Sequence, residues 1–365
     1  MKNIFLAKSP LQLINALEAR HYFKLEDRDC ILIIMGDSKS YPQMMELARS
    51  QNEWNNIILL NRVSLMFFDP WRLESINYED SDKLRKTVFR SAFYNIWRLN
   101  RLARSVGDVE NVFMGCNNSI YMRHFVNSFK HANTILLDDG TGTIDIARKR
   151  RVAGKRRAGV DSEVPVKLYK KIKINLKRFL LRLKDYQPDK VCFFTVYDID
   201  VYGEDTLIEN NFKYLRGKSL NSDVLDEVYF VGSPLSETGV MSEDDYIDHL
   251  IKVKDYFKGS KLVYIVHRRE SKKKLGIIRE NLGITVKMFD YPLEYQIAVI
   301  GSKPKVLAAF VTSVLENMRV IMGDDLMMIS FKLIKGAYIN KDGVDEVYEY
   351  YEKNMSDNFK LVELT

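Results

Sequence analysis

The chain has 365 residues, of which 46% are hydrophobic and 29% charged, and its formal net charge is +7. This length suits two domains, and the composition is typical of a soluble globular protein rather than a disordered or fibrous one. No run approaches the ~20 consecutive apolar residues of a membrane-spanning helix, and the N-terminal residues do not resemble a signal peptide. The three cysteines form no C-x-x-C pair, which favours reduced thiols in a cytoplasm and argues against a zinc site or a disulfide framework.

Short apolar runs bounded by turn residues recur along the chain, with amphipathic stretches between them. This alternation predicts parallel strands in sheets that helices cover on both faces. The first series of predicted strands lies at residues 3–7, 30–35, 56–61, 111–115 and 134–138. The second series lies at residues 191–195, 227–232, 261–267, 285–290, 306–311 and 319–323. We therefore predict an α/β protein with two Rossmann-like, doubly wound domains that face a central cleft. Their expected bounds are 1–187 and 188–365, and the last helix is expected to pack back on the N-terminal domain.

The excess of positive charge is concentrated in residues 148–184, inside the predicted N-terminal domain. Residues 148–157, RKRRVAGKRR, contain seven basic residues in ten. In residues 166–184 apolar side chains recur at roughly helical spacing among the basic ones, which predicts a basic amphipathic helix. That helix could be a solvated surface helix packed on its own domain, or it could bind an anionic membrane surface or an acidic polymer. No nucleic-acid-binding motif accompanies the basic run, so nucleic acid is not expected as a partner.

Ligands of open α/β sheets bind beyond the carboxyl ends of the strands, so the residues that follow each strand are the candidates for chemistry. After the first strand, Ser9 can cap a helix that begins at Pro10. The chain contains neither G-x-G-x-x-G nor a P-loop, which disfavours nicotinamide and ATP as ligands. His267 closes an apolar strand and is followed by Arg268 and Arg269. This cluster suits a phosphate, although a surface histidine in a basic turn has the same sequence.

Two further strand ends carry groups that could hold a nucleotide. Thr312 and Ser313 follow the strand 306–311, and hydroxyls beside the free N–H groups of a helix start form an anion site. They also fit an ordinary N-cap in which Glu316 completes a capping box from Ser313; the two interpretations are compatible. Glu294 could accept hydrogen bonds from ribose hydroxyls, or it could be a solvated residue at a helix start.

The stretch ILLDDGTGT places Asp138, Asp139 and Gly140 directly after a buried strand. The two carboxylates could bind Mg²⁺, cap the following helix or supply a general base. A metal site would need further carboxylates, and only Asp145 is close in sequence. Gly140 allows the backbone a positive φ or a close approach to a ligand.

In this order the motifs resemble those of bacterial GT-B sialyltransferases, namely the lipooligosaccharide sialyltransferases (glycosyltransferase family 52) and the related capsular polysialyltransferases. These families share a D/E-D/E-G motif, an HP motif and an S-S/T motif. The stretch AKSPLQL, which includes Ser9, looks like their opening strand and loop. The resemblance runs from residue 3 to about residue 320. Arg268 stands in place of the family's proline, and Thr312 stands where serine is common.

The resemblance implies a role for each matching residue. Asp138 matches the general base, and Asp139 and Gly140 complete its motif, with Asp139 expected to hold the turn. His267 matches the histidine that contacts the CMP phosphate and acts as the acid. The implied donor-binding residues are Thr312 and Ser313 for the phosphate, Glu294 for the ribose, Gly232 and Ser233 in a loop beside the nucleotide, and Arg268 as an added positive charge.

The implied activity is inverting transfer of a sialic-acid-type (nonulosonic acid) sugar from a CMP donor to a bacterial surface glycan, such as lipooligosaccharide, LPS O-antigen or capsule. The expected enzyme needs no metal and no cofactor. Its expected place is cytoplasmic and peripheral at the inner membrane, where residues 148–184 would contact anionic lipid. One alternative is a GT-B transferase that uses another donor, of the UDP-sugar or CDP-glycerol type. Another is a non-catalytic module that binds anionic glycan or nucleic acid.

Overall fold

The computed structural model describes residues 1–35, 40–51, 53–60, 81–157, 178–219, 223–301, 303–339 and 343–364. The chain forms two compact units that interleave along the sequence. Unit 1 comprises Met1–Leu137, Ala147–Phe194 and Asp200–Ile208. Unit 2 comprises Asp138–Ile146, Thr195–Ile199 and Glu209–Thr365. The predicted boundary between residues 187 and 188 stays a prediction.

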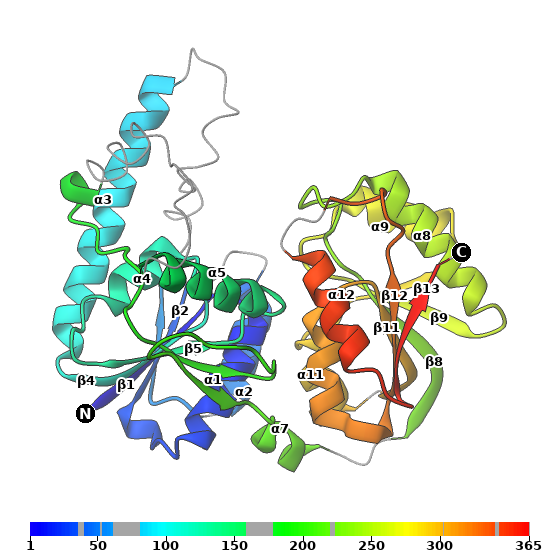
Figure 1. Ribbon diagram of the computed structural model, residues 1–365, viewed down its shortest axis with the longest axis horizontal. Helices are drawn as coiled ribbons and strands as arrows, with labels where there is room; N and C mark the ends of the chain where they lie inside the picture. Colours follow the sequence, from blue (N-terminus) through cyan, green and yellow to red (C-terminus); the bar gives the residue numbers. More distant parts are fainter. Residues whose placement is uncertain are drawn as a thin grey trace. The chain divides into compact units, whose positions relative to one another are not determined.

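Unit 1 is built on a sheet with the strand order β3-β2-β1-β4-β5-β6-β7. Its strands are β1 (Lys2–Ala7), β2 (Cys30–Ile34), β3 (Asn56–Leu59), β4 (Val109–Met114), β5 (Asn133–Leu137), β6 (Cys192–Thr195) and β7 (Thr206–Glu209). The pairs from β3 through β6 are parallel. Helices lie on both faces of the sheet, as Figure 1 shows. They are α1 (Pro10–Tyr22), α2 (Tyr41–Gln51), α3 (Ser81–Val106), α4 (Ile120–Val126) and α5 (Gly142–Arg157).

Apolar residues in the central strands make the core of unit 1. Phe5 of β1 and Phe113 of β4 are both buried, and their rings stack with centroids 4.2 Å apart. The first crossover leaves β1 through Ser9, whose hydroxyl accepts a hydrogen bond from the Gln12 N–H. Pro10 follows as the first helical residue, because its fixed φ suits that position and its missing N–H has no intrahelical acceptor to lose. The predicted N-cap at Ser9 is thereby confirmed.

Unit 2 contains a sheet with the strand order β10-β9-β8-β11-β12-β13. The strands are β8 (Val224–Val231), β9 (Lys261–Ile265), β10 (Thr285–Lys287), β11 (Lys303–Ala309), β12 (Met327–Lys332) and β13 (Phe359–Glu363). All the pairs are parallel. In order of appearance this is the 3-2-1-4-5-6 arrangement of Rossmann folds, whose order reverses between β8 and β11. The helices are α7 (Lys213–Lys218), α8 (Glu243–Tyr256), α9 (Lys272–Glu280), α10 (Leu293–Tyr295), α11 (Ser313–Met322) and α12 (Val344–Lys353).

The predicted class, an α/β protein with two Rossmann-like doubly wound domains, is confirmed by these two parallel sheets. The last helix, α12, belongs to unit 2 and is followed by the strand β13. Its buried Tyr348 accepts a hydrogen bond from the Leu333 N–H at 3.0 Å, just beyond β12. In the described parts of the chain, no helix has the length and apolarity to cross a membrane.

The predicted strand at residues 319–323 is wrong, because these residues end the helix α11 and its C-cap. The apolar side chains of Leu315, Met318 and Ile321 are buried at helical spacing. The short run 319–323, taken alone, is too short to show this spacing and therefore resembles a strand. Gly323 has φ +53° and ends the helix. The strand that follows is β12, which begins at Met327, four residues beyond the end of the predicted strand.

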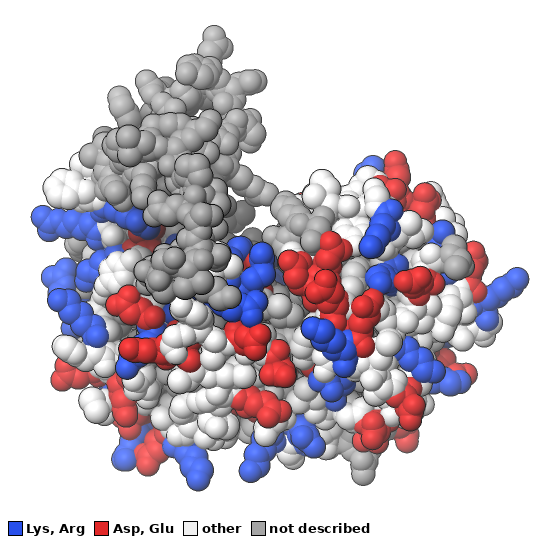
Figure 2. Space-filling model, in the orientation of Figure 1, with Lys and Arg blue, Asp and Glu red and all other residues white. Residues whose placement is uncertain are grey.

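The basic segment is only partly inside the described residues, because residues 158–177 lie outside them. Residues 148–157 form the second half of α5. Arg150, whose side chain is 12% exposed, forms an ion pair of 2.7 Å with the nearly buried Asp205, so part of this run serves the packing of unit 1. On the face that Figure 2 shows, described Lys and Arg side chains are interspersed with Asp and Glu.

Candidate active site

Three strand ends meet at the carboxyl edge of the second sheet. Strands β9, β8 and β11 are neighbours and parallel, so the residues that follow them share one edge. Ser233 follows β8, His267 follows β9 and Thr312 follows β11. The Ser233 hydroxyl donates a 3.0 Å hydrogen bond to the carbonyl of Val311, which joins the first loop to the third. This edge is the place where strand order reverses, the usual ligand crevice of such sheets.

Thr312 is the N-cap of α11, with its hydroxyl accepting a 3.3 Å hydrogen bond from the Val314 N–H. Ser313 is the first helical residue, so the expected capping box between Ser313 and Glu316 is wrong. The buried carboxylate of Glu316 instead pairs with Arg319 at 2.6 Å. The first N–H groups of a helix lack intrahelical acceptors and attract anions. The start of α11, with the hydroxyls of Thr312 and Ser313 beside it, can therefore still bind a phosphate.

His267 is half-buried, and its imidazole is electrically neutral at ordinary pH. Burial first, then the charges of Arg268, Arg269 and Lys274, lowers the pKa of His267 to about 3. The Nδ1 atom accepts a 3.2 Å hydrogen bond from the Arg269 N–H, which places the ring proton on Nε2. The imidazole of the free protein is thus uncharged, and the predicted role of His267 as the acid stays a prediction. A neutral ring can still donate from Nε2 to a phosphate oxygen.

Glu294 is 3% exposed, and its Oε1 atom accepts a 2.8 Å hydrogen bond from the Asn317 amide on α11. Burial raises the pKa of Glu294, while the Asn317 hydrogen bond and the charge of Arg268 act against that rise. Glu294 is therefore not a solvated residue at a helix start, which was the alternative interpretation of the sequence. Arg268, the residue in place of the family's proline, links the His267 turn electrostatically to Glu294.

Asp138 and Asp139 occupy different environments in the turn after β5, where Gly140 adopts φ +72°. Asp138 is 1% exposed, and its carboxylate accepts hydrogen bonds from the Thr195 hydroxyl at 2.5 Å and the Val196 N–H at 2.9 Å. Burial, despite these bonds, raises the pKa of Asp138 to about 7. Asp139 is half-buried. The side chain that ties this turn to the end of β6 is thus Asp138, the residue predicted to be the base.

The Asp138 turn belongs to unit 2 together with His267 and Thr312. Tyr197, two residues beyond Thr195, packs its ring against Tyr350 of α12 with centroids 5.3 Å apart. The neighbouring Tyr351 hydroxyl donates a 2.6 Å hydrogen bond to the Thr312 carbonyl. A chain of contacts therefore runs from the aspartate turn to the start of α11. The Tyr197 hydroxyl is buried, and in the described part of the chain it has no hydrogen-bond partner.

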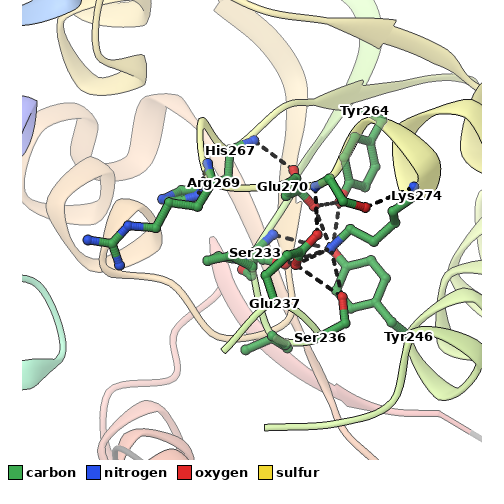
Figure 3. Close-up of polar contacts among 12 residues, drawn as sticks. Ser233, Ser236, Glu237, Tyr246, Tyr264, His267, Arg269, Glu270 and Lys274 are labelled. Carbon is green, nitrogen blue, oxygen red and sulfur yellow. Dashed lines mark hydrogen bonds and ion pairs between the residues drawn. The ribbon is translucent and has the colours of Figure 1, made fainter. Parts of the chain in front are cut away.

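Sequence reasoning missed a buried polar network behind His267, which Figure 3 shows. Its central residues are Glu270 and Lys274, whose side chains are both 0% exposed and 2.8 Å apart. Glu270 lies in the turn before the N-cap Ser271 and Lys274 in the first turn of α9, so no helical spacing in the sequence signals this pair. Gly232 adjoins this network, since a Cβ there would lie 2.5 Å from Glu270 Oε2. Ser9, a candidate residue of the sequence analysis, lies in unit 1 and not in the unit that holds this network.

The model of the family described as Alpha-2,8-polysialyltransferase (POLYST) matches residues 3–328. No curated protein matches the chain. A crystal structure of a putative UDP-N-acetylglucosamine 2-epimerase from Listeria monocytogenes is similar with a TM-score of 0.50 and 8% identity, covering 97% of this chain and 88% of that one. The S. aureus MnaA-UDP co-structure is similar with a TM-score of 0.50 and 10% identity, covering 98% and 89%. At such identities these likenesses show the fold alone, which is that of GT-B proteins.

Proposed function

Because the chain belongs to the alpha-2,8-polysialyltransferase family, and is thus a glycosyltransferase of the sialyltransferase type, we propose that it transfers a nonulosonic acid from a CMP-linked donor to a bacterial surface glycan. The acceptor would be a lipooligosaccharide, an O-antigen or a capsule precursor. The observation that supports this most is the convergence of His267, Glu294 and the α11 start on one edge of the second sheet. That edge offers a hydrogen-bond donor, an acidic group and an anion site.

The CMP moiety would bind at this edge of unit 2. Its phosphate would meet the first N–H groups of α11 and the hydroxyls of Thr312 and Ser313. Arg268 adds a full positive charge there, and Glu294 would accept from the ribose hydroxyls. The half-buried His267 would donate from Nε2 to a phosphate oxygen. As negative charge grows on the departing phosphate, the pKa of His267 would rise from its low value, so the ring could then hold a proton for the leaving group.

Asp138 would act as the general base toward the acceptor hydroxyl. A catalytic base works best when its pKa lies near the operating pH, and burial places the pKa of Asp138 at about 7. The acceptor oxygen would attack the anomeric carbon from the face opposite CMP while its proton passes to Asp138. The new glycosidic bond forms as the bond to the phosphate oxygen breaks, which inverts the anomeric configuration. Positive groups of the chain itself would stabilise the leaving phosphate, so the proposed step requires no metal.

The donor assignment is tested by the thermal stability of the protein with CMP, UDP or GDP. A ligand that binds only the folded state raises the apparent melting temperature. We expect CMP to give the largest rise, and His267→Ala together with Thr312→Ala to reduce it. An equal or larger rise with UDP would instead indicate a UDP-sugar donor. A protein that no nucleotide stabilises, and that binds anionic glycan with a steep salt dependence, would be a non-catalytic module.

A further inference from the structure

Lys274 is a buried cation in a position where helix electrostatics disfavour it. It lies in the first turn of α9, after the N-cap Ser271, although the positive end of the helix dipole disfavours cations there. Its side chain is 0% exposed, and its Nζ atom lies 2.8 Å from Glu270 and 3.1 Å from Glu237. A buried charge is costly unless it is paired and hydrogen-bonded. The groups that pair with Lys274 must therefore offset the cost of burying its charge.

These partners come from two different loops at the candidate donor site. The loop after β8 supplies the Ser233 carbonyl, 3.2 Å from Nζ, and Glu237. The turn after β9 supplies Glu270. Glu237 also accepts a 2.8 Å hydrogen bond from the Ser271 N–H, which ties the two loops a second time. Figure 3 shows Lys274 pointing into the space between these groups. One ammonium group thus holds both loops together.

A directed chain of hydrogen bonds runs through the same network. The Ser233 N–H donates to the Tyr246 hydroxyl at 3.3 Å, and the Tyr246 and Tyr264 hydroxyls are 2.7 Å apart. Tyr264 in turn donates to the carboxylate of Glu270. The other oxygen of Glu270 accepts from the His267 N–H at 2.7 Å. Because the final acceptor is an ionised carboxylate, each donor in the chain points toward it.

We propose that Lys274 is a positioning residue for the donor site: paired with Glu270 and Glu237, it fixes the loop 232–237 and the turn 267–271 in one arrangement, so that His267 faces the donor phosphate. Glu270 accepts from the His267 N–H through one oxygen and pairs with Lys274 through the other, and the charge of Lys274 favours the ionised carboxylate. Lys274 also acts on the imidazole as a positive neighbour, together with Arg268 and Arg269. This inference rests on the proposed function.

The kinetic test compares Lys274→Met with Lys273→Met, a neighbour on α9 whose side chain is 79% exposed. The measured quantities are kcat and donor KM in CMP-sugar turnover. We expect kcat/KM of Lys274→Met to fall about 100-fold, as small misplacements of a catalytic group do, mostly through donor KM. Lys273→Met should match the wild type. Wild-type kinetics in folded Lys274→Met would overturn the inference.

A second readout follows His267 itself by NMR in the ligand-free protein. The chain has five histidines, and the spectrum of His267→Gln assigns the signal. Loss of the Lys274 charge removes a cation that lowers the pKa of His267, so the titration midpoint should move upward in Lys274→Met and stay in place in Lys273→Met. An unchanged midpoint in Lys274→Met would show that Lys274 does not act on the imidazole, and that result contradicts the proposal.

Lys274→Met leaves Glu270 without its cation and could fail to fold. The double variant Lys274→Met/Glu270→Gln removes both members of the fully buried ion pair, leaves Glu237 with the Ser271 N–H as its partner, and is then scored in the same two assays. Should that variant also fail to fold, Glu237→Gln, which keeps the pair of Lys274 and Glu270, is scored by its donor KM, which should rise as the coupling of the two loops loosens; a wild-type donor KM would overturn the inference. A wild-type protein without CMP-sugar turnover contradicts the proposed function, whereas the His267 titration still tests whether Lys274 acts on His267.

Discussion

Asp138 is a buried side chain with a structural contact and a proposed chemical role. Its carboxylate anchors the turn after β5 to Thr195 and Val196. Those hydrogen bonds favour the ionised form, yet burial outweighs them and the pKa stands at about 7. Asp139, one residue on, is half-buried. The pair therefore provides a matched comparison between a buried carboxylate and a more accessible one.

If Asp138 is the base, kcat/KM should rise with pH through about 7, because only the ionised carboxylate can take a proton. Asp138→Asn should abolish turnover while donor binding survives. Its amide can still accept from the Val196 N–H and donate to the Thr195 hydroxyl, so the fold should persist. Asp139→Asn is the matched control and should keep most of the activity. Loss of activity in Asp139→Asn alone would move the base to that residue.

The same pKa predicts how stability depends on pH. Asp138 binds its proton more tightly in the folded than in the unfolded protein, so it contributes a loss of folding stability as the pH rises from about 4 to about 7. The full effect would be on the order of 4 kcal/mol. Denaturant unfolding at several pH values should show a smaller fall over that range in Asp138→Asn than in the wild type. Identical profiles would contradict a raised pKa.

Gly232 is required because of the close approach of Glu270, not because of a special backbone angle. A Cβ at this position would meet Glu270 Oε2 at 2.5 Å and the Tyr264 hydroxyl at 2.6 Å, and both groups are held by buried hydrogen bonds. Gly232→Ala should therefore destabilise the protein by about 1–3 kcal/mol and raise donor KM. Gly276→Ala, on α9 with open space around it, should be neutral or stabilising. Denaturant midpoints of the two variants provide the comparison.

At the scale of elements, α11 contributes its N-terminus to the proposed donor site. Thr312→Val keeps the shape of the N-cap residue and removes its hydroxyl. Loss of the cap should cost about 1 kcal/mol of stability, and the affinity for CMP should fall because the helix start loses a hydroxyl and its ordered geometry. Isothermal titration with CMP measures the second effect. An unchanged affinity would place the phosphate away from α11.

The segment that follows residue 177 supports a proposal about the membrane. Phe179 and Leu180 are exposed by 78% and 52%, beside basic residues of the segment 148–184. We propose that Phe179 and Leu180 insert into the cytoplasmic face of the inner membrane and attach the enzyme peripherally, with neighbouring basic residues attracting anionic lipid. Phe179→Ser/Leu180→Ser should sediment less with vesicles rich in anionic lipid than the wild type does. Equal sedimentation of both proteins would reject this attachment.

At the scale of the whole molecule, the sequence predicted the two parallel sheets because apolar runs alternate with amphipathic stretches, and this pattern is local. It also placed Asp138, His267 and Thr312 at strand ends, where the structure has them. It failed at residues 319–323, where a short apolar run belongs to a helix, and at residues 191–195, which were expected in the second series but form β6 of the first sheet. It could not predict that Glu237 pairs with Ser271 and Lys274, because such contacts join residues more than 30 positions apart.

The sequence also did not predict that the two units interleave along the chain. The Asp138 turn and residues 195–199 follow strands of the first sheet, yet they belong to the unit that holds His267 and Thr312. Side-chain contacts such as that of Tyr197 with Tyr350 create this association. It brings the proposed base and the proposed donor site into one compact body.

The central claim is transfer of a nonulosonic acid from CMP, and the release of CMP tests it most directly. The wild-type protein would be incubated with CMP-linked sialic, legionaminic or pseudaminic acid and with glycan acceptors, beside Asp138→Asn and Lys273→Met. We predict acceptor-dependent CMP release with at least one donor, a product of inverted anomeric configuration, no release by Asp138→Asn and wild-type release by Lys273→Met. Transfer from a UDP-linked sugar instead, or equal turnover by Asp138→Asn, would contradict the account.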